Sequence, residues 1–341
     1  MTGEIQRPLE LKRRSNRTVR LIGACIAAIV AVATPGSEFT ARAEAPFQKT
    51  QSPSYYRMKL GDFEVTALYD GGGNGAIKSE MLRGNSKEIT SLLQQGFVDP
   101  DKIEGTVAGF LVNTGDKLVL VDTGTGGHWG GPSLGKLAAN LAASGYRPEQ
   151  VDLVLITHLH ADHAGGVVSM DGKRVFPNAE VRVSKADSDF WLSEESAKKA
   201  PKQAQVFFEV ARLASAPYIA AGKWKPFSNP NEAITPYIKA YPILGHTPGH
   251  SGYEFSSKGQ TMLVWGDVVH VPSVQLPNPS VGIVFDVDGP NAIKAREDLF
   301  KTLADSRTIV AGAHMPFPSL GRLRKNGVGY TWLPVTYSDN P

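Results

Sequence analysis

The stretch Thr157-His158-Leu159-His160-Ala161-Asp162-His163 is the most informative part of this chain. It places three imidazoles and one carboxylate within six consecutive positions. The preceding residues, 151–156, predict a buried strand because they form a short run rich in Val, Leu and Ile. Gly165 and Gly166 follow and indicate a turn. We therefore expect the stretch on the loop that leaves the C-terminal end of a core strand, where α/β folds often build their sites.

The spacing within this stretch suits metal binding. His158 and His160 are two residues apart, so their side chains point the same way if the segment is extended. Asp162 and His163 follow on the turn and can face a neighbouring point, which suits two ions side by side. Imidazole and carboxylate ligands favour zinc or a similar divalent ion. The alternative, histidines held by ordinary hydrogen bonds on a surface loop, is disfavoured by the density of the cluster.

The first 43 residues resemble a signal peptide. Six basic residues between positions 7 and 20 form a positively charged head. The uncharged, mostly apolar stretch 21–33 follows, and Ala41-Arg42-Ala43 supplies small residues at the spacing of a cleavage site. The alternative is an uncleaved membrane anchor, but a stretch of about 13 residues is short for a membrane span. We expect a periplasmic or secreted protein, with no stable membrane insertion of residues 44–341.

Charge and cysteine content exclude several classes of protein. The net charge of +3 arises from the leader, because residues 44–341 contain 29 basic and 30 acidic residues. Such a balance offers no positive field for nucleic acid. The single cysteine, Cys25, lies in the leader, so residues 44–341 form no disulfide and provide no thiolate ligand. With 41% apolar and 20% charged residues, the chain can build one large globular domain.

Further along the chain, predicted strands alternate with helices. Four of these strands end in polar residues that lie beside glycines, at Asp122, at 158–163, at Asp267 and at His314. A fifth predicted strand, 238–244, leads into Gly245-His246-Thr247-Pro248-Gly249-His250. The glycine-rich run 71–75 favours a turn between strands, and its alternative is a loop at the rim of the site.

The order of these motifs resembles the metallo-β-lactamase superfamily. The motifs are His-x-His-x-Asp-His, Gly-His-Thr-Pro-Gly-His, Gly-Asp and a late Gly-Ala-His, and the resemblance covers roughly residues 60 to 335. It implies an αββα sandwich of two mixed β-sheets flanked by helices. The expected order is a signal peptide at 1–43, a flexible arm at 44–59 and one hydrolase domain at 60–341.

The resemblance also implies a dinuclear metal site. It assigns one ion to His158, His160 and His246. It assigns the other ion to Asp162, His163 and His314, and Asp267 would bridge the two. Zinc is the expected metal, with Mn, Co or Fe as alternatives, and the catalytic carboxylates would be Asp162 and Asp267.

Two further polar residues are expected to orient these ligands and not to bind an ion. His250 lies in the same motif as His246, but the resemblance assigns the ion to the first histidine of that motif. Asp122 ends a predicted strand and is expected to anchor the site or cap a turn. Metal ligands require such partners, since their orientation depends on the hydrogen bonds they make.

Within the superfamily, four longer stretches resemble the methyl parathion hydrolases and related lactonase-like enzymes. This likeness implies hydrolysis of organophosphate triesters by a hydroxide that bridges the two ions. An acyl-homoserine lactonase or a broad esterase with the same site is the alternative. A binding protein without catalysis is disfavoured by the full ligand set, and a nuclease by the charge. The stretches are Phe190-Trp191-Leu192-Ser193, residues 221–227, Val274-Gln275-Leu276 and Val328-Gly329-Tyr330.

The resemblance places the substrate pocket near four residues. Trp129, Trp191 and Phe207 would form aromatic walls, with ordinary core packing as the alternative. His270 stands where an apolar pocket residue is expected, so it would contact substrate or lie at a solvent-facing rim. The partner would be a small ester, lactone or phosphotriester, and the chain could form a homodimer.

Overall fold

The computed structural model describes residue 45, residues 47–49 and residues 51–338. The predicted signal peptide at 1–43 therefore lies outside the described residues. The chain divides into two units, Met1–Lys49 and Thr50–Pro341, and all the described strands and helices belong to the second. The predicted arm at 44–59 is too long, because residues 55–59 pair with the next strand as part of β1 (Tyr55–Leu60).

Two mixed sheets form the centre of the second unit. Strands β5, β6 and β7 pair in parallel, as do β11 and β13, and the other neighbours are antiparallel. The six-stranded sheet has the order β1, β2 (Phe63–Ile77), β4 (Ile103–Asn113), β5 (Leu118–Val121), β6 (Leu153–Leu155) and β7 (Glu180–Arg182). The seven-stranded sheet has the order β15 (Gly329–Pro334), β14 (Leu320–Asn326), β13 (Ile309–Ala311), β11 (Gln260–Val264), β10 (Ser251–Ser257), β9 (Ile238–Pro242) and β8 (Ala233–Thr235). A small third sheet pairs β3 (Leu82–Arg83) with β12 (Gly282–Ile283).

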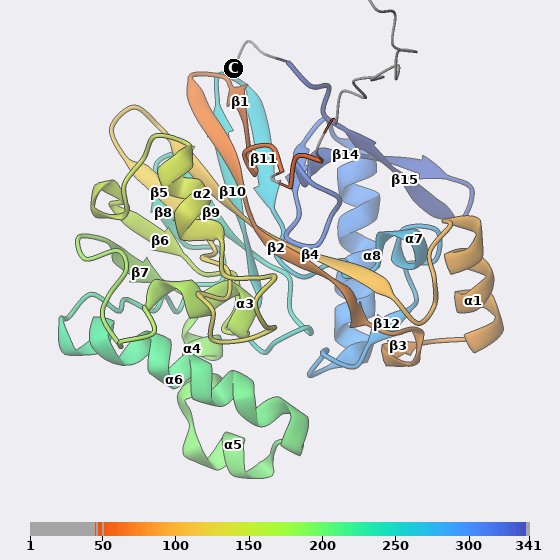
Figure 1. The fold of residues 1–341 in the computed structure, drawn as a ribbon, viewed down its shortest axis with the longest axis horizontal. Coiled ribbons are helices and arrows are strands. Elements are labelled where there is room, and N and C mark those ends of the chain that lie inside the picture. The colour runs from red at the N-terminus through yellow and green to blue at the C-terminus, as the bar shows by residue number, and fades with distance from the viewer. Residues whose placement is uncertain (1–44, 46, 50, 339–341) are drawn as a thin grey trace, which may run out of the picture. The chain divides into compact units, whose positions relative to one another are not determined.

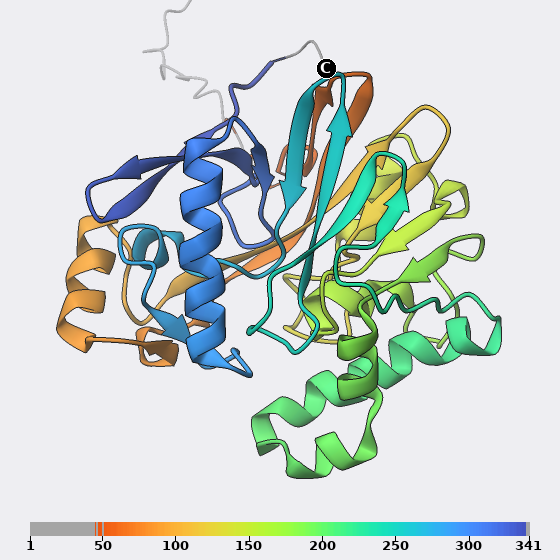
Figure 2. The ribbon, with the colours of Figure 1, turned by 180° about the vertical axis from the view of Figure 1, so that it is seen from behind.

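Some helices cover the outer faces of these sheets and others lie beside them, as Figures 1 and 2 show. Their bounds are α1 (Ser86–Gln95), α2 (Leu137–Ala143), α3 (Ala161–Ala164), α4 (Lys185–Leu192), α5 (Glu194–Lys199), α6 (Gln205–Ala220), α7 (Pro272–Gln275) and α8 (Gly289–Asp305). Short 3-10 turns are η1 (Ser79–Met81), η2 (Pro148–Gln150), η3 (Gly165–Val167) and η4 (Lys202–Ala204). This arrangement confirms the expected αββα sandwich.

Three apolar clusters explain the layers. Side chains from both sheets, such as Phe110 and Tyr253, form the central core between them. Helices α2, α3 and α6 pack against the other face of the six-stranded sheet. Helix α8 packs on the seven-stranded sheet, where the rings of Phe300 and Trp265 stack with centroids 5.7 Å apart. Burial of apolar surface on both faces of each sheet fixes the strand register.

The glycine-rich run does not form the predicted turn. Gly71, Gly72 and Gly73 lie inside β2, opposite residues 105–107 of β4, with register shifts on both sides. A β-carbon at Gly72 would lie 2.5 Å from the hydroxyl oxygen of Tyr69 and 2.8 Å from the carbonyl oxygen of Gly105. Glycine is therefore required here by close packing, and the pattern that favoured a turn instead marks an irregular strand.

The sheets deliver the predicted polar residues to one region. Residues that follow the C-terminal ends of β5, β6, β11 and β13 include Asp122, the 158–163 stretch, Asp267 and His314. Because these parallel strands meet at the same edge of their sheets, the polar residues are brought together. Within the described part of the chain, no helix has the length and apolar character needed to cross a membrane.

Candidate metal centre

Seven side chains predicted to hold metal converge from five segments. His158 and His160 follow β6, and Asp162 and His163 lie on the single turn of α3. The loops after β9, β11 and β13 supply His246, Asp267 and His314. All seven residues are at most 8% exposed. They fall into two groups whose candidate ligand atoms lie within 4.8 Å of one another.

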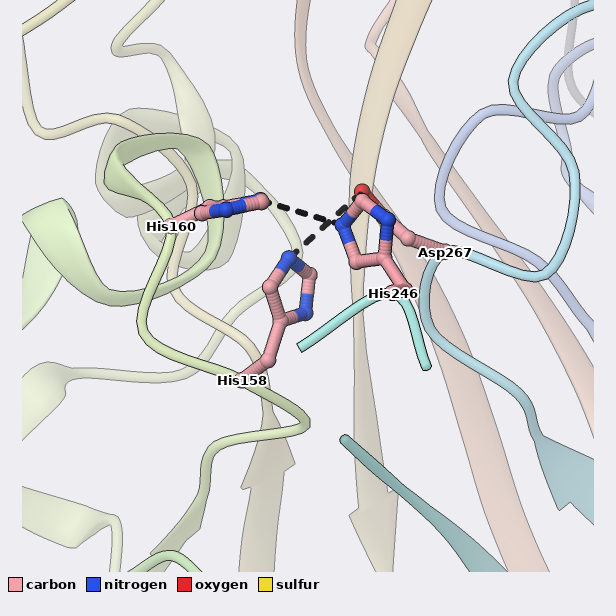
Figure 3. Close-up of side chains that lie close together, drawn as sticks. All are labelled: His158, His160, His246 and Asp267. Atoms are coloured by element: carbon pink, nitrogen blue, oxygen red, sulfur yellow. Dashed lines mark hydrogen bonds and ion pairs between the residues drawn. The ribbon is translucent and has the colours of Figure 1, made fainter. Parts of the chain in front are cut away.

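The first cluster consists of His158, His160, His246 and Asp267 (Figure 3). The Nε2 atom of His246 lies 3.0 Å from Nδ1 of His160 and 3.3 Å from Oδ2 of Asp267. The Nε2 atom of His158 lies 3.5 Å from the same carboxylate oxygen. Three ring nitrogens and one carboxylate oxygen thus face a common point, which matches the four ligands that zinc prefers.

The second cluster consists of Asp162, His163 and His314. Their ring Nε2 atoms lie 2.9 Å (His163) and 3.1 Å (His314) from Oδ1 of Asp267. Both ring atoms lie 3.6 Å from Oδ2 of Asp162. Asp267 therefore presents Oδ2 to the first cluster and Oδ1 to the second, as a carboxylate shared by two ions would.

Unpartnered buried atoms test whether this set fits metal ions. The Nε2 atoms of His158, His163 and His314 and Oδ1 of Asp267 are buried and make no hydrogen bond of acceptable geometry. Buried polar groups are costly without a partner, so several such atoms around one point require an explanation. Divalent ions would satisfy all of these atoms, and the residues present therefore fit a pair of metal ions.

Burial and neighbouring charges favour the metal-binding protonation state of several of these residues. Burial and neighbouring imidazoles lower the pKa of His158 and His160 well below their usual value, so both rings are neutral and keep a lone pair. Burial alone would raise the pKa of Asp267, but the surrounding imidazoles, His163 and His314 first, hold it well below its usual range. Neutral imidazole and ionised carboxylate are the forms that bind metal.

Asp122 and His250 bond predicted ligands at atoms that face away from the two clusters. The Asp122 carboxylate accepts hydrogen bonds from the backbone N–H and hydroxyl of Thr157, both 2.8 Å, and lies 2.8 Å from Nδ1 of His163. The Nδ1–H of His250 donates to the carbonyl of Ile243, and its Nε2 accepts the backbone N–H of Asp267. Burial lowers the pKa of His250 to about 3, which keeps this acceptor available. Both residues occupy the orienting positions that the sequence predicted.

Gly266 is required next to Asp267. Its φ is +59°, and a β-carbon there would lie 2.5 Å from Nε2 of His250. Only glycine adopts this conformation at little cost, and only glycine leaves the room. The Gly-Asp motif therefore sets the position of the shared carboxylate.

Three residues that support the site were missed by sequence reasoning. Asp286 lies 2.9 Å from Nδ1 of His246, and the carbonyl oxygen of Thr106 lies 2.6 Å from Nδ1 of His314. Asp187 accepts the backbone N–H groups of Leu159 and Gly249, and so ties the first histidine motif to the second. None of the three belongs to a motif, and each lies at least 28 positions from the residue it contacts, so no local signal pointed to them.

A small, mostly apolar cavity of about 50 Å³ borders both clusters. Three of the four predicted substrate residues, Trp129, Phe207 and His270, line it. His270 is 4% exposed and its Nε2 lies 3.0 Å from Oδ2 of Asp267, so a solvent-facing rim position is wrong. Among the described residues that line this cavity, none is Lys or Arg. The full lining is Gly73, Ile77, Gly105, Thr106, Val107, Trp129, Leu134, His160, Asp162, Phe207, Asp267, His270, Phe285 and His314.

Trp191 is placed differently from the prediction. It does not line the cavity beside the clusters but a second chamber of about 560 Å³, which also includes Phe190 and Phe208 in its wall. The Trp191 ring is 2% exposed and packs edge-on against His160 at 5.0 Å. It therefore supports a predicted ligand. The two cavities share His160, Phe207 and Phe285 in their walls.

Comparison with known proteins identifies relatives of this chain. A family model described as the metallo-beta-lactamase superfamily matches residues 103–314. A probable metallo-hydrolase of Mycobacterium tuberculosis is 26% identical over 237 residues, which cover 58% of this chain and 72% of that protein. A probable metallo-hydrolase of Mycobacterium bovis matches to the same extent.

Two solved structures are also similar. The hydrolase AbOPH in the beta lactamase superfamily has a TM-score of 0.80 and 34% identity, covering 85% of this chain and 100% of that one. AidC, a dizinc quorum-quenching lactonase in complex with the product N-hexnoyl-L-homoserine, has a TM-score of 0.75 and 28% identity. That match covers 84% of this chain and 99% of AidC. The particular likeness to methyl parathion hydrolases stays a prediction.

Proposed function

This chain belongs to the metallo-β-lactamase superfamily, and from that premise we propose that it is a dinuclear metallo-hydrolase that opens lactones, N-acyl-homoserine lactones among them. The observation that supports this proposal is the mostly apolar cavity, without Lys or Arg among its described lining residues, directly beside both clusters. AidC, a lactonase with 28% identity over most of the chain, supports the same choice of substrate.

The charges around the cavity favour an uncharged substrate. Asp162 and Asp267 lie in its wall, whereas a carboxylate or phosphodiester substrate would need a cation that the described lining does not provide. Like charges at short range cost energy, most of all where water is excluded. A lactone or a fully esterified phosphate meets this requirement.

The seven converging residues would hold two divalent ions. His158, His160 and His246 would bind one, Asp162, His163 and His314 the other, and Asp267 both. When bound, the ions would lower the pKa of a coordinated water toward ~7 and polarise the oxygen of a carbonyl or phosphoryl group.

The protein's own groups would position and protect the reaction. The Trp129 and Phe207 rings, with centroids 6.1 Å apart, would enclose the reacting group beside the clusters and exclude water. The chamber of about 560 Å³, which shares Phe207, would take the rest of the substrate. The Asp162 carboxylate is 8% exposed in the cavity wall, so an oxygen of this group could accept the proton that the attacking water loses and give it to the leaving oxygen.

Uncharged aryl phosphotriesters are the second candidate. The aromatic rings of Trp129, Phe207 and Phe285 around the cavity suit a flat aryl leaving group. The same cation-free wall that suits a lactone suits a phosphotriester.

A parallel assay separates the two substrates. Purified, zinc-loaded protein would be given an N-hexanoyl-homoserine lactone, an aryl ester and an aryl dialkyl phosphotriester under one set of conditions. We expect the highest kcat/KM for the lactone and loss of all turnover after metal removal. Turnover of the phosphotriester alone would reverse the order of the candidates, and full activity without metal would contradict both.

We also propose that residues 1–43 direct export and are then removed. Support comes from the basic head, the apolar stretch and the Ala41-Arg42-Ala43 site. N-terminal sequencing of the protein recovered from its native cells should begin at Glu44. A chain that still begins at Met1 would contradict cleavage.

A further inference from the structure

We propose that Asp286 is a positioning residue for His246 and that the metal affinity of the first cluster depends on it. This inference rests on the proposed metal site but not on the choice of substrate. Asp286 lies on the segment between β12 and α8, outside every motif that identified the ligands. Loss of Asp286 is expected to weaken the binding of the first ion specifically, because the second cluster has other supports.

The contact is short and fully enclosed. Oδ1 of Asp286 lies 2.9 Å from Nδ1 of His246, and the two side chains are 1% and 3% exposed. The other ring nitrogen, Nε2, is the one that faces His160 and Asp267. A carboxylate at Nδ1 keeps the proton there, which leaves the lone pair of Nε2 for an ion and increases its basicity.

Both oxygens of this carboxylate are in use. Oδ2 of Asp286 accepts the backbone N–H of Ile283 at 3.2 Å, while Oδ1 serves His246. An asparagine has a single acceptor oxygen, so it must leave one of these two donors without a partner. The structure therefore requires a carboxylate at this position.

The backbone reinforces the same connection. Val287 donates its N–H to the carbonyl of His246 at 3.0 Å, and Asp288 donates to the carbonyl of Gly245 at 2.8 Å. The side-chain contact and these two bonds join the 286–288 segment to the His246 loop at three points. His246 is thereby fixed in position as well as in ring orientation.

The neighbour of Asp286 links this support to the substrate cavity. Phe285 lines both the cavity beside the clusters and the second chamber, and its ring lies 6.4 Å from that of Phe207. One short segment thus carries a wall of the cavity and the support of a metal ligand. The Asp286 side chain bonds His246 and Ile283 and none of Asp162, His163 and His314, so a change at Asp286 should act mainly on the first ion.

Zinc affinity provides the test. Asp286→Asn and the matched control Asp305→Asn, which removes an exposed carboxylate at the end of α8, would be stripped of metal and titrated with zinc against a competing chelator. We expect Asp286→Asn to bind one ion as the unaltered protein does and the other about 10–100-fold more weakly. The control should bind both normally. Unchanged binding of both ions, or equal weakening of both, would overturn the proposal.

A measurement on the unaltered, zinc-loaded protein keeps the proposal testable if the variant does not fold. Nitrogen-15 NMR of the histidine rings should show a proton on Nδ1 of His246 and none on Nε2. A His246 ring that carries its proton on Nε2, or none on Nδ1, would overturn the proposal. Because both experiments measure metal binding, a protein that binds zinc but opens no lactone would contradict the proposed function alone.

Discussion

The two clusters differ in where their outer support comes from. His163 of the second cluster is supported by Asp122, at the end of β5, and His314 by the backbone of Thr106 in β4. Thr106 lies within the six-stranded sheet, and Asp122 directly follows its strand β5. His246 of the first cluster is instead supported by Asp286, on a connecting segment beside the apolar chamber. The support of His246 thus adjoins the second chamber, whereas the supports of His163 and His314 lie within or directly after strands.

This difference indicates how the site can vary. A support in the middle of a sheet is hard to change without damage to the core, because register and packing depend on it. A support on a connecting segment can change together with the cavity wall, since loops tolerate substitution better than strands. Substrate preference and the affinity for one ion are therefore expected to be coupled in this protein.

Removal of the shared carboxylate should have the largest effect, because Asp267 faces both clusters. Asp267→Ala is expected to lower zinc content below one ion per chain and to reduce kcat/KM by more than the 10–100-fold typical of an outer contact. Elemental analysis and the lactone assay check this. Two ions retained in the variant would show that Asp267 is not shared.

Metal binding should depend strongly on pH. Burial disfavours the charged form of His246, but hydrogen bonds and charges from Asp267 and Asp286 outweigh it and raise the pKa to about 9. An ion must therefore displace a proton from this ring at neutral pH, so zinc affinity should rise as the pH increases toward 9. Calorimetry in buffers of different ionisation enthalpy should detect proton release. Binding without release would contradict the expected protonation.

The stability of the metal-free protein should follow the opposite trend. The pKa of His246 is about 9 in the folded state, above the ordinary value of 6.5 expected in the unfolded chain. Protonation therefore contributes stability that is fully present below pH 6.5 and is lost as the pH rises through 9. Thermal unfolding of stripped and zinc-loaded protein between these values should show a widening gap. A constant gap would argue against a raised pKa.

Asp122→Asn should weaken the second cluster more than the first, because Asp122 contacts the His163 ring directly and reaches His158 only through the Thr157 hydroxyl. The carboxylate serves three groups, the Thr157 N–H, the Thr157 hydroxyl and the His163 ring, so the amide must leave part of this set unsatisfied. We expect about 10–100-fold weaker binding of one zinc ion and a loss of about 1–3 kcal/mol of stability. Together with Asp286→Asn, this variant tests whether the clusters have separate supports. Weakening of the same ion by both variants would contradict the comparison.

The smallest effect is expected at the cavity wall. Phe207→Leu should change KM for apolar substrates by about 10-fold, because Phe207 lines both cavities. Zinc content should stay unchanged, because Phe207 packs its ring against His160 but makes no hydrogen bond to that ligand. The matched control is Phe300→Leu, which alters a ring in the core beneath α8. A similar KM change in the control would assign the effect to general loss of packing.

The sequence predicted the fold and the converging ligands because their signals are local. Each motif follows a predicted apolar strand, so the residues alone placed His158, Asp267 and His314 at strand ends. The sandwich fold and the grouping of these residues into one site came from the resemblance of the motif series to the metallo-β-lactamase superfamily. The glycine-rich run failed because its composition also suits an irregular strand, and only pairing with β4 distinguishes the two.

The parts of the site that the sequence did not predict depend on contacts between residues far apart in the chain. Asp286 and Thr106 belong to no motif, and their roles follow only from which segments the sandwich places side by side. Trp191 was assigned to the substrate wall by the family resemblance, but the packing of α4 against α6 places its ring edge-on against His160. The start of β1 was missed for the same reason, since its register depends on β2.

Anomalous diffraction from crystals of zinc-loaded protein tests the central claim most directly. Two peaks per chain are predicted, one among His158, His160 and His246 and the other among Asp162, His163 and His314, with Asp267 in contact with both. A single peak, or two peaks away from these side chains, would contradict the account.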